Sequence, residues 1–124
     1  MMNEEVKHVL KINMNKKYEY FIKRVVDSEK VWSLKDKDGW VTLGIEDKYY
    51  FPIWPKKEFA DICIGDEWSE CYAECISLKD FINEWGYRLE ENNIKPTIMW
   101  HEGKGIDVDW DRLKEDIKYE LKKY

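Results

Sequence analysis

Residues 49–55 read Tyr49-Tyr50-Phe51-Pro52-Ile53-Trp54-Pro55, and this run of large apolar side chains decides which fold the sequence can adopt. Alternate side chains of a strand point to opposite faces, so a strand over residues 48–54 has two apolar faces. One face carries Tyr49, Phe51 and Ile53, and the other carries Tyr50, Pro52 and Trp54. Pro52 has no backbone N–H, which predicts a position at a sheet edge or at a strand end.

The segment before this strand has the pattern of a hairpin. Residues 30–35 form the first predicted strand, residues 36–39 the turn, and residues 40–45 the returning strand. Gly39 supplies the positive φ that such a turn usually needs. In the returning strand Val41, Leu43 and Ile45 take one face, and Trp40, Thr42 and Gly44 take the other.

Apolar side chains at helical spacing predict helices on both sides of these strands. We expect helices over residues 16–29 (capped by Asn15), 55–64 and 78–91, and from Asp109 to Tyr124, with further strands at 72–76, 95–101 and 105–108. The last helix presents Leu121 and Tyr124 to the interior along with earlier apolar residues. We therefore predict an α+β two-layer sandwich in the order α-β-β-β-α-β-α-β-β-α. Its sheet is mostly antiparallel, and its helices pack chiefly on one face.

Length and charge set limits on organisation and on partners. We expect a charged leader over residues 1–15 and one domain over residues 16–124. With 21 basic and 26 acidic residues, the net charge of −5 disfavours nucleic acid and anionic membranes as partners. The N-terminus does not resemble a signal peptide, and no apolar run reaches the ~18 residues of a membrane span. Cys63, Cys71 and Cys75 are an odd number, so free thiols in a reducing cytoplasm are expected.

Several short motifs, in this order, resemble a small bacterial family known as domain of unknown function 2750. They are Lys17-Tyr18-Glu19-Tyr20-Phe21, Val31-Trp32, Asp38-Gly39-Trp40, Phe51-Pro52-Ile53-Trp54-Pro55, Glu67-Trp68, and Leu78 with Phe81 and Trp85. The resemblance covers roughly residues 16–124 and implies a single-domain bacterial protein. It implies no activity, cofactor or catalytic residue.

Neither metal chemistry nor catalysis is expected from the remaining motifs. Cys63, Cys71 and Cys75 with His101 or His8 could supply four ligands, but their spacings differ from the tight pairs of structural zinc sites. No metal and no cofactor is therefore expected. His101 ends a predicted strand beside Glu102, where a Cys–His pair is conceivable, although a histidine at a hairpin end is more often simply solvated.

The aromatic face is the most informative candidate site. If helices cover the Val41 side of the sheet, Trp40, Tyr50 and Trp54 share the other side, and exposed Trp and Tyr are typical of binding hot spots. If another element covers that side as well, the three are ordinary core residues. We expect a non-enzymatic protein-binding module that uses this face or the Pro52 strand as a sheet edge. Its partner would be another protein or a second copy.

A second hypothesis belongs to a different class. It is a small enzyme or small-ligand-binding protein with an aromatic-lined pocket served by His101 or Glu102. A third hypothesis, stacking of single-stranded nucleic acid on the aromatic side chains, is disfavoured by the acidic net charge.

Overall fold

The computed structural model describes residues 4–66 and 68–124, with Gly65 and Asp66 as backbone only, and its fold is α+β as predicted. The helical elements are α1 (Glu4–Lys11), α2 (Met14–Ser28), α3 (Lys57–Asp66), α4 (Leu78–Asp80), η1 (Phe81–Trp85), α5 (Gly86–Glu91) and α6 (Trp110–Leu121). The strands are β1 (Lys30–Asp36), β2 (Gly39–Trp40), β3 (Leu43–Ile45), β4 (Lys48–Ile53), β5 (Tyr72–Ser77), β6 (Ile94–His101) and β7 (Lys104–Asp107). Residues 1–3 of the expected leader and Glu67 of the quoted motifs lie outside the described residues.

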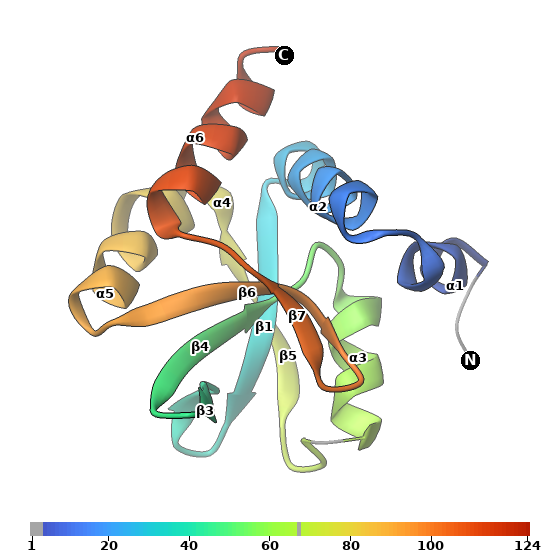
Figure 1. The fold of residues 1–124 in the computed structure, drawn as a ribbon, viewed down its shortest axis with the longest axis vertical. Coiled ribbons are helices and arrows are strands. Elements are labelled where there is room, and N and C mark those ends of the chain that lie inside the picture. Colours follow the sequence, from blue (N-terminus) through green and yellow to red (C-terminus); the bar gives the residue numbers. More distant parts are fainter. Residues whose placement is uncertain (1–3, 67) are drawn as a thin grey trace.

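The strands form two sheets, where the sequence predicted one. The first sheet has the order β2-β1-β5 and the second has the order β3-β4-β6-β7. All neighbouring strands are antiparallel except β4 and β6, which run parallel. The sheets meet at an antiparallel bridge between Trp32 and Trp54. In Figure 1 the strands cross at the centre of the molecule, with α5, α6, α2 and α3 arranged around them.

The predicted strand over residues 40–45 is interrupted, and the interruption moves the chain from one sheet to the other. Trp40 pairs with Lys35 of β1, whereas Leu43 pairs with Tyr50 of β4. Between them the backbone of Val41 donates to Leu34 O at 3.0 Å, and the Val41 side chain is buried. A simple alternation of faces therefore does not extend from Trp40 to Ile45, because the two ends belong to different sheets.

Pro52 lies near the end of β4, but β4 is not an edge strand. The strand has β6 along one side and β3 along part of the other side. Beyond the end of β3, its neighbour is β1, where the Ser33 hydroxyl donates to Pro52 O at 2.6 Å. On the β1 side Pro52 faces the side chain of Ser33 and not a regular strand ladder, so its missing N–H costs no ladder bond there. On the β6 side it is in register with Thr97. The expectation of a sheet edge is wrong, and the strand-end alternative fits.

Helix α2 buries the predicted stripe of Phe21, Ile22, Val25 and Val26, but it begins earlier than expected. Its N-cap is Asn13, not Asn15, and the Asn13 side chain accepts from Lys16 N at 2.9 Å. At the other end of the chain α6 ends at Leu121, so the expected inward position of Tyr124 is wrong, because this residue follows the helix and is 76% exposed.

Helix α1 occupies most of the segment expected to be a charged leader. Val6 and Val9 are 1% and 2% exposed and belong to the same core cluster as the α2 stripe. On its polar side Glu5 makes ion pairs with Lys56 at 2.6 Å and with Arg24 at 3.4 Å. The hydrogen bond from Lys56 holds the pKa of Glu5 below its usual value. Helix α1 is therefore packed and tethered in the described structure.

The predicted helix over residues 78–91 is helical throughout, but its middle turn, η1, is a π-helix. A π-turn contains an additional residue, which rotates the following side chains around the helix axis. Trp85 then packs against Trp40 and Phe51, with ring centroids 4.9 and 5.3 Å away. The next residue, Gly86, lies against the indole of Trp110, which occupies the space that a Cβ would need.

None of the helices in the described residues is both long enough and apolar enough to cross a membrane.

The contact between Gly86 and Trp110 predicts an unusually costly glycine substitution. Gly86→Ala places a methyl group inside the Trp110 indole, so we expect a loss of at least about 2 kcal/mol in urea unfolding. The usual gain of about 1 kcal/mol from Gly to Ala in a helix offsets only part of this cost. Gly44→Ala is the control, because its Cβ would only touch the Tyr49 ring at 3.5 Å. Equal stabilities of the two variants would contradict the packing described.

The burial of α1 predicts that its apolar side contributes to global stability. We expect Val9→Ser to lower the free energy of unfolding by about 2 kcal/mol, because it removes buried apolar atoms and buries a hydroxyl. His8→Ser changes the exposed neighbouring residue on the same helix and should alter stability by less than about 0.5 kcal/mol. Chemical denaturation of both variants provides the comparison. A Val9→Ser variant as stable as the wild type would show that α1 does not belong to the cooperative unit.

Candidate functional site

The structure separates the three aromatic residues that were expected to share one face. Trp54 is 1% exposed, and its indole N–H donates to Trp100 O at 2.9 Å. Its ring also packs edge-on against Trp68, with centroids 6.5 Å apart. Trp54 is therefore a core residue in this structure and presents no surface to a partner.

Trp40 lies on the Phe51 side of β4 and not on the Tyr50 side. Its ring contacts Phe51 and Trp85 edge-on, and the Lys35 ammonium lies 4.7 Å from its centroid. Trp40 remains partly exposed at the rim of this aromatic cluster. Trp40 and Tyr50 were expected to share one face of a single sheet. They do not, because the chain changes from the first sheet to the second between Trp40 and Leu43.

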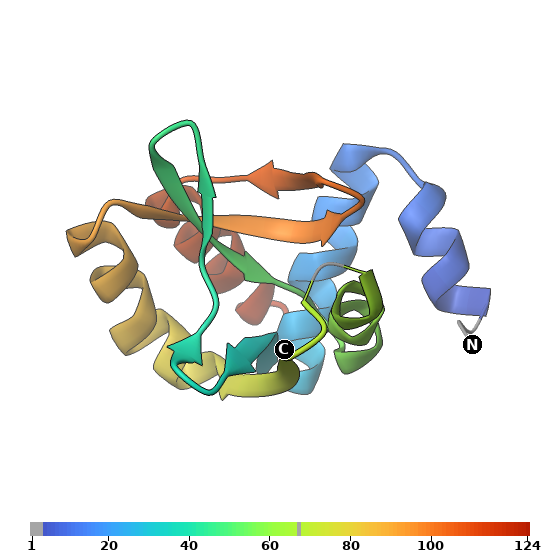
Figure 2. The same ribbon diagram turned by 90° about the horizontal axis from the view of Figure 1, so that it is seen from below.

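Tyr50 is the residue of the three that lines a surface hollow. This Tyr50 hollow, of about 370 Å³, lies on the face of the second sheet that carries Tyr50. Its lining residues come from β3, β4, β6, β7, the β6–β7 turn and the first turn of α2: Met14, Lys17, Ile45, Tyr50, Met99, Trp100, Gly103, Lys104, Gly105, Ile106 and Asp107. Figure 2 shows no described helix above β7 and the β3–β4 hairpin. The hollow is thus an open part of the sheet.

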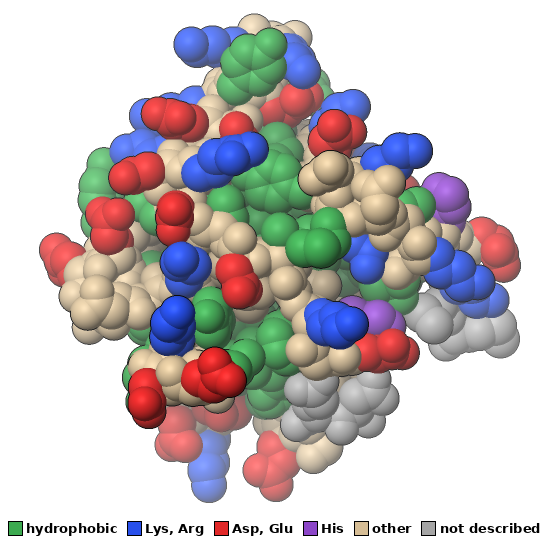
Figure 3. All heavy atoms as spheres, in the orientation of Figure 1, with side chains coloured by type: hydrophobic (Ala, Val, Ile, Leu, Met, Phe, Trp, Pro, Cys, Tyr) green, Lys and Arg blue, Asp and Glu red, His purple; other side chains and the backbone are tan. Residues whose placement is uncertain are grey.

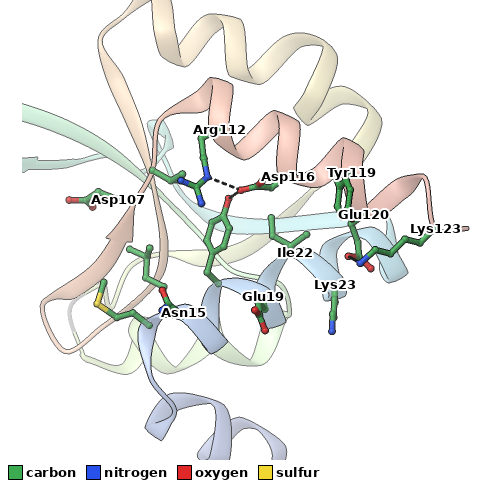
Figure 4. Close-up of a pocket in the computed structure, with 14 residues that line it drawn as sticks. Asn15, Glu19, Ile22, Lys23, Asp107, Arg112, Asp116, Tyr119, Glu120 and Lys123 are labelled. Atoms are coloured by element: carbon green, nitrogen blue, oxygen red, sulfur yellow. Dashed lines mark hydrogen bonds and ion pairs between the residues drawn. The ribbon is translucent and has the colours of Figure 1, made fainter.

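A second hollow, of about 670 Å³, lies between α2 and α6. Figure 4 shows Arg112 and Asp116 of α6 directed toward α2 and Ile22 of α2 directed toward α6, whereas Glu19 and Lys23 point away from α6. The two helices are joined across it by Tyr18, whose hydroxyl donates to Asp116 Oδ2 at 2.5 Å. Arg112 Nε donates to the same oxygen at 3.3 Å. Burial, followed by the hydrogen bond to the Asp116 carboxylate, raises the pKa of Tyr18 well above its usual value.

The far end of this second hollow is also charged. Glu120 is 9% exposed, and its carboxylate lies 3.1 Å from the Lys123 ammonium. Tyr119 beside it is 67% exposed, and the Lys123 ammonium lies 5.2 Å from its ring centroid. An exposed tyrosine next to a cation forms a surface that suits contact with polar or aromatic groups.

The two hollows adjoin, because Met14, Ile106 and Asp107 line both of them. We call the combined depression the long groove. It runs from the β3–β4 hairpin across β7 to the space between α2 and α6. Met14 lies where the hollows meet and is 61% exposed, and Ile45 at the hairpin end is 41% exposed. Figure 3 shows hydrophobic side chains reaching the surface along the middle of the face drawn in Figure 1, between charged residues.

His101 and Glu102 lie outside the long groove. His101 ends β6, its side chain is 21% exposed, and its Nε2 is 3.4 Å from Glu102 Oε1. The Glu102 side chain is 80% exposed and belongs to the β6–β7 turn, where its φ is 50°. Neither residue lines either of the two hollows that form the long groove. The Tyr50 hollow is lined instead by their neighbours in the chain, Trp100 and Gly103.

The three cysteines differ in exposure. The buried Cys63 thiol lies 3.3 Å from Trp100 O, while Cys71 and Cys75 are partly exposed. Burial raises the pKa of Cys71, and the carboxylates of Asp36 and Glu70 raise it further, which disfavours the thiolate. Among the described residues, no three His, Cys, Asp or Glu side chains come together as a possible metal site.

Sequence reasoning missed most of the long groove. Tyr18 appears in the sequence only as part of a family motif, whereas in the structure its hydroxyl bridges to Asp116, ninety-eight positions later in the sequence. Met14 belonged to the expected leader. The one local signal for this groove was Met14, which follows the N-cap Asn13 in the first turn of α2. An exposed apolar side chain at this position has no role within its own helix, which indicates contact with another group.

The raised pKa of Tyr18 predicts a specific response to alkaline pH. A tyrosine that holds its proton more tightly when folded stabilises the fold below its unfolded pKa of about 10, and this contribution is lost as the pH rises above that value. Tyr18→Phe should therefore cost about 1 kcal/mol in urea unfolding at pH 7 and progressively less above pH ~10. A cost that does not change between pH 7 and pH ~11 would contradict this assignment. Tyr119→Phe, at an exposed tyrosine, is the matched control.

Comparison with known proteins supplies a family and no activity. A comparison with curated proteins finds no match. Residues 18–117 match a family described as protein of unknown function (DUF2750), and this range includes the strands of both sheets, most of α2 and most of α6. The match begins after α1 and after Met14, so Met14 lies outside it, whereas Ile106 and Asp107, the other two residues where the hollows meet, lie inside it. Since the matched range spans well over half of the chain, this protein belongs to the DUF2750 family.

Proposed function

We propose that this chain is a non-enzymatic, cytoplasmic protein-binding module, and that the long groove holds an extended segment of a partner protein. The observation that carries the proposal is the continuity of the two hollows at Met14, Ile106 and Asp107. Two adjoining hollows on the surface suit an extended peptide better than a compact small molecule, which is usually enclosed on most sides.

The side chains along the groove are suited to peptide recognition. Tyr50 and Met14 offer large apolar area near the surface, and Met adapts its shape to different partners because it is unbranched and flexible. Gly103 leaves the backbone of the β6–β7 turn without a side chain beside the Tyr50 hollow, and nothing lies within 4 Å of the position that its Cβ would take. A partner backbone can therefore approach this part of the chain closely.

Charge favours a partner segment that contains carboxylates. The Tyr50 hollow carries Lys17 and Lys104 but one described acidic residue, Asp107, although the whole chain has a net charge of −5. Neither of these lysines forms an ion pair with a described carboxylate within 4.0 Å. We therefore propose an apolar segment flanked by Asp or Glu as the occupant.

Two adjacent tyrosines provide a matched test of this site. Tyr50 lines the groove, while Tyr49 is the preceding residue of the same strand and points to the opposite face, with 55% of its surface exposed. Peptides selected by the wild-type protein from a displayed library of short random sequences should contain acidic and large apolar residues. Their Kd should rise at least about tenfold in Tyr50→Ala and in Met14→Glu, and should stay within about twofold in Tyr49→Ala.

Two results would overturn the proposal. Selected peptides that bind Tyr50→Ala and Met14→Glu as tightly as the wild type would place the contact outside the groove. Failure of the folded wild type to select any peptide above background would exclude peptide recognition by this chain. Near-UV circular dichroism of each variant checks that the folded state is retained.

A further inference from the structure

A third hollow, of about 710 Å³, lies apart from the long groove and shares no lining residue with either of its parts. It is formed where the C-terminal ends of α2 and α6 approach α4, next to the end of β5. Figure 1 shows α4 between α6 and the end of α2. We call it the Leu78 hollow. Its volume falls within the range of about 300–1,000 Å³ that is usual for small-molecule sites.

The floor of the Leu78 hollow is apolar. Leu78 and Ile82 are 4% and 8% exposed and belong to the core, while Leu121 at the end of α6 is 36% exposed. The partly exposed thiol of Cys75 on β5 also lines it. These side chains offer contact to an apolar ligand body and no hydrogen bond of ordinary strength.

Three lysines from three separate elements surround this floor. Lys30 begins β1, Lys79 lies in α4 and Lys118 lies in α6, and Glu29 is the one carboxylate among the described lining residues. None of the three lysines forms an ion pair within 4.0 Å among the residues that the structure describes, although most of the ion pairs elsewhere in this chain involve lysine. In an acidic protein this arrangement is a local concentration of unpaired positive charge.

The two serines at the wall and the backbone N–H of Leu78 already make hydrogen bonds within the protein. Ser77 Oγ accepts from Asp80 N at 3.1 Å, and Ser28 Oγ donates to Arg24 O at 2.9 Å. The backbone N–H of Leu78 donates to Glu29 O at 2.9 Å. The three lysine ammonium groups are the positively charged donors at this wall, beside the neutral side-chain amide of Asn83, and charged donors favour an anionic group over a neutral one.

We propose that the Leu78 hollow binds a small amphipathic anion, with an apolar body against Leu78, Ile82 and Leu121 and one anionic group between the lysines. This site is independent of the long groove and does not depend on the proposed function. Binding requires both the anionic group and the apolar body of the ligand. The three lysines alone are solvated surface charges, and the apolar floor alone does not distinguish an anion from a neutral molecule.

Two fluorescent probes that differ by one anionic group test the proposal. Anilinonaphthalene sulfonate carries a sulfonate, and N-phenylnaphthylamine has the same aromatic body without it. We expect the sulfonate probe to bind the folded wild type at least about tenfold more tightly than the neutral probe. The double variant Lys79→Gln/Lys118→Gln should weaken the sulfonate probe at least about tenfold and leave the neutral probe unchanged. Lys37→Gln/Lys48→Gln, at two exposed lysines that do not line the hollow, is the matched control.

Cys75 gives an independent readout of where the probe binds. The sulfonate probe should slow alkylation of Cys75 by iodoacetamide at least threefold and leave Cys71 unaffected, as measured by mass spectrometry of the labelled peptides. Tyr50→Ala should not change binding of the probe, whatever the outcome for peptides in the long groove. Equal binding of both probes, unchanged binding to the Lys79→Gln/Lys118→Gln variant, or unprotected Cys75 would each overturn the proposal. Unfolding midpoints confirm that each variant is folded at the assay temperature.

Discussion

The backbone pairing of Trp32 with Trp54 is the interaction on which the rest of the structure depends. The two residues exchange both hydrogen bonds, at 2.9 and 2.8 Å, and this bridge is the backbone pairing between the two sheets in the described chain. Around it the Trp54 indole donates to Trp100 O and the Ser33 hydroxyl donates to Pro52 O. Since an unpaired polar group in a buried position costs about 1–3 kcal/mol, this junction is stable because each of these groups has a partner.

The same junction determines where the aromatic residues lie. Strand β4 lies between β6 and β1, and its Phe51 side chain points to the interior. There Trp85 of η1 packs against Trp40 and Phe51. Most of the large aromatic area is thereby used for core packing rather than for contact with partners. On the opposite face of β4 Tyr50 is only partly buried, and it lines the long groove.

Helix α1 and the start of α2 connect the core to that surface. Val6 and Val9 hold α1 against the core, and its ion pairs with Lys56 and Arg24 add a polar tether. The chain then turns at Asn13 into α2, so Met14 and Lys17 are brought beside β7. The segment outside the family match therefore contributes directly to the shape of the groove. At the opposite ends of α2 and α6, the same helices leave the separate, lysine-lined Leu78 hollow.

The sequence by itself determined the fold class and most of the elements, because these depend on local spacing of apolar side chains. The α2 stripe, the hairpin turn at Gly39 and the apolar run of β4 were all readable from neighbours in the chain. Only the tertiary structure decided the change of sheet between Trp40 and Leu43, the burial of Trp54 and the assembly of the groove. Each of these depends on residues far apart in sequence, such as Trp32 with Trp54 and Tyr18 with Asp116. A local pattern shows which side chains avoid water, but it does not show which distant element covers them.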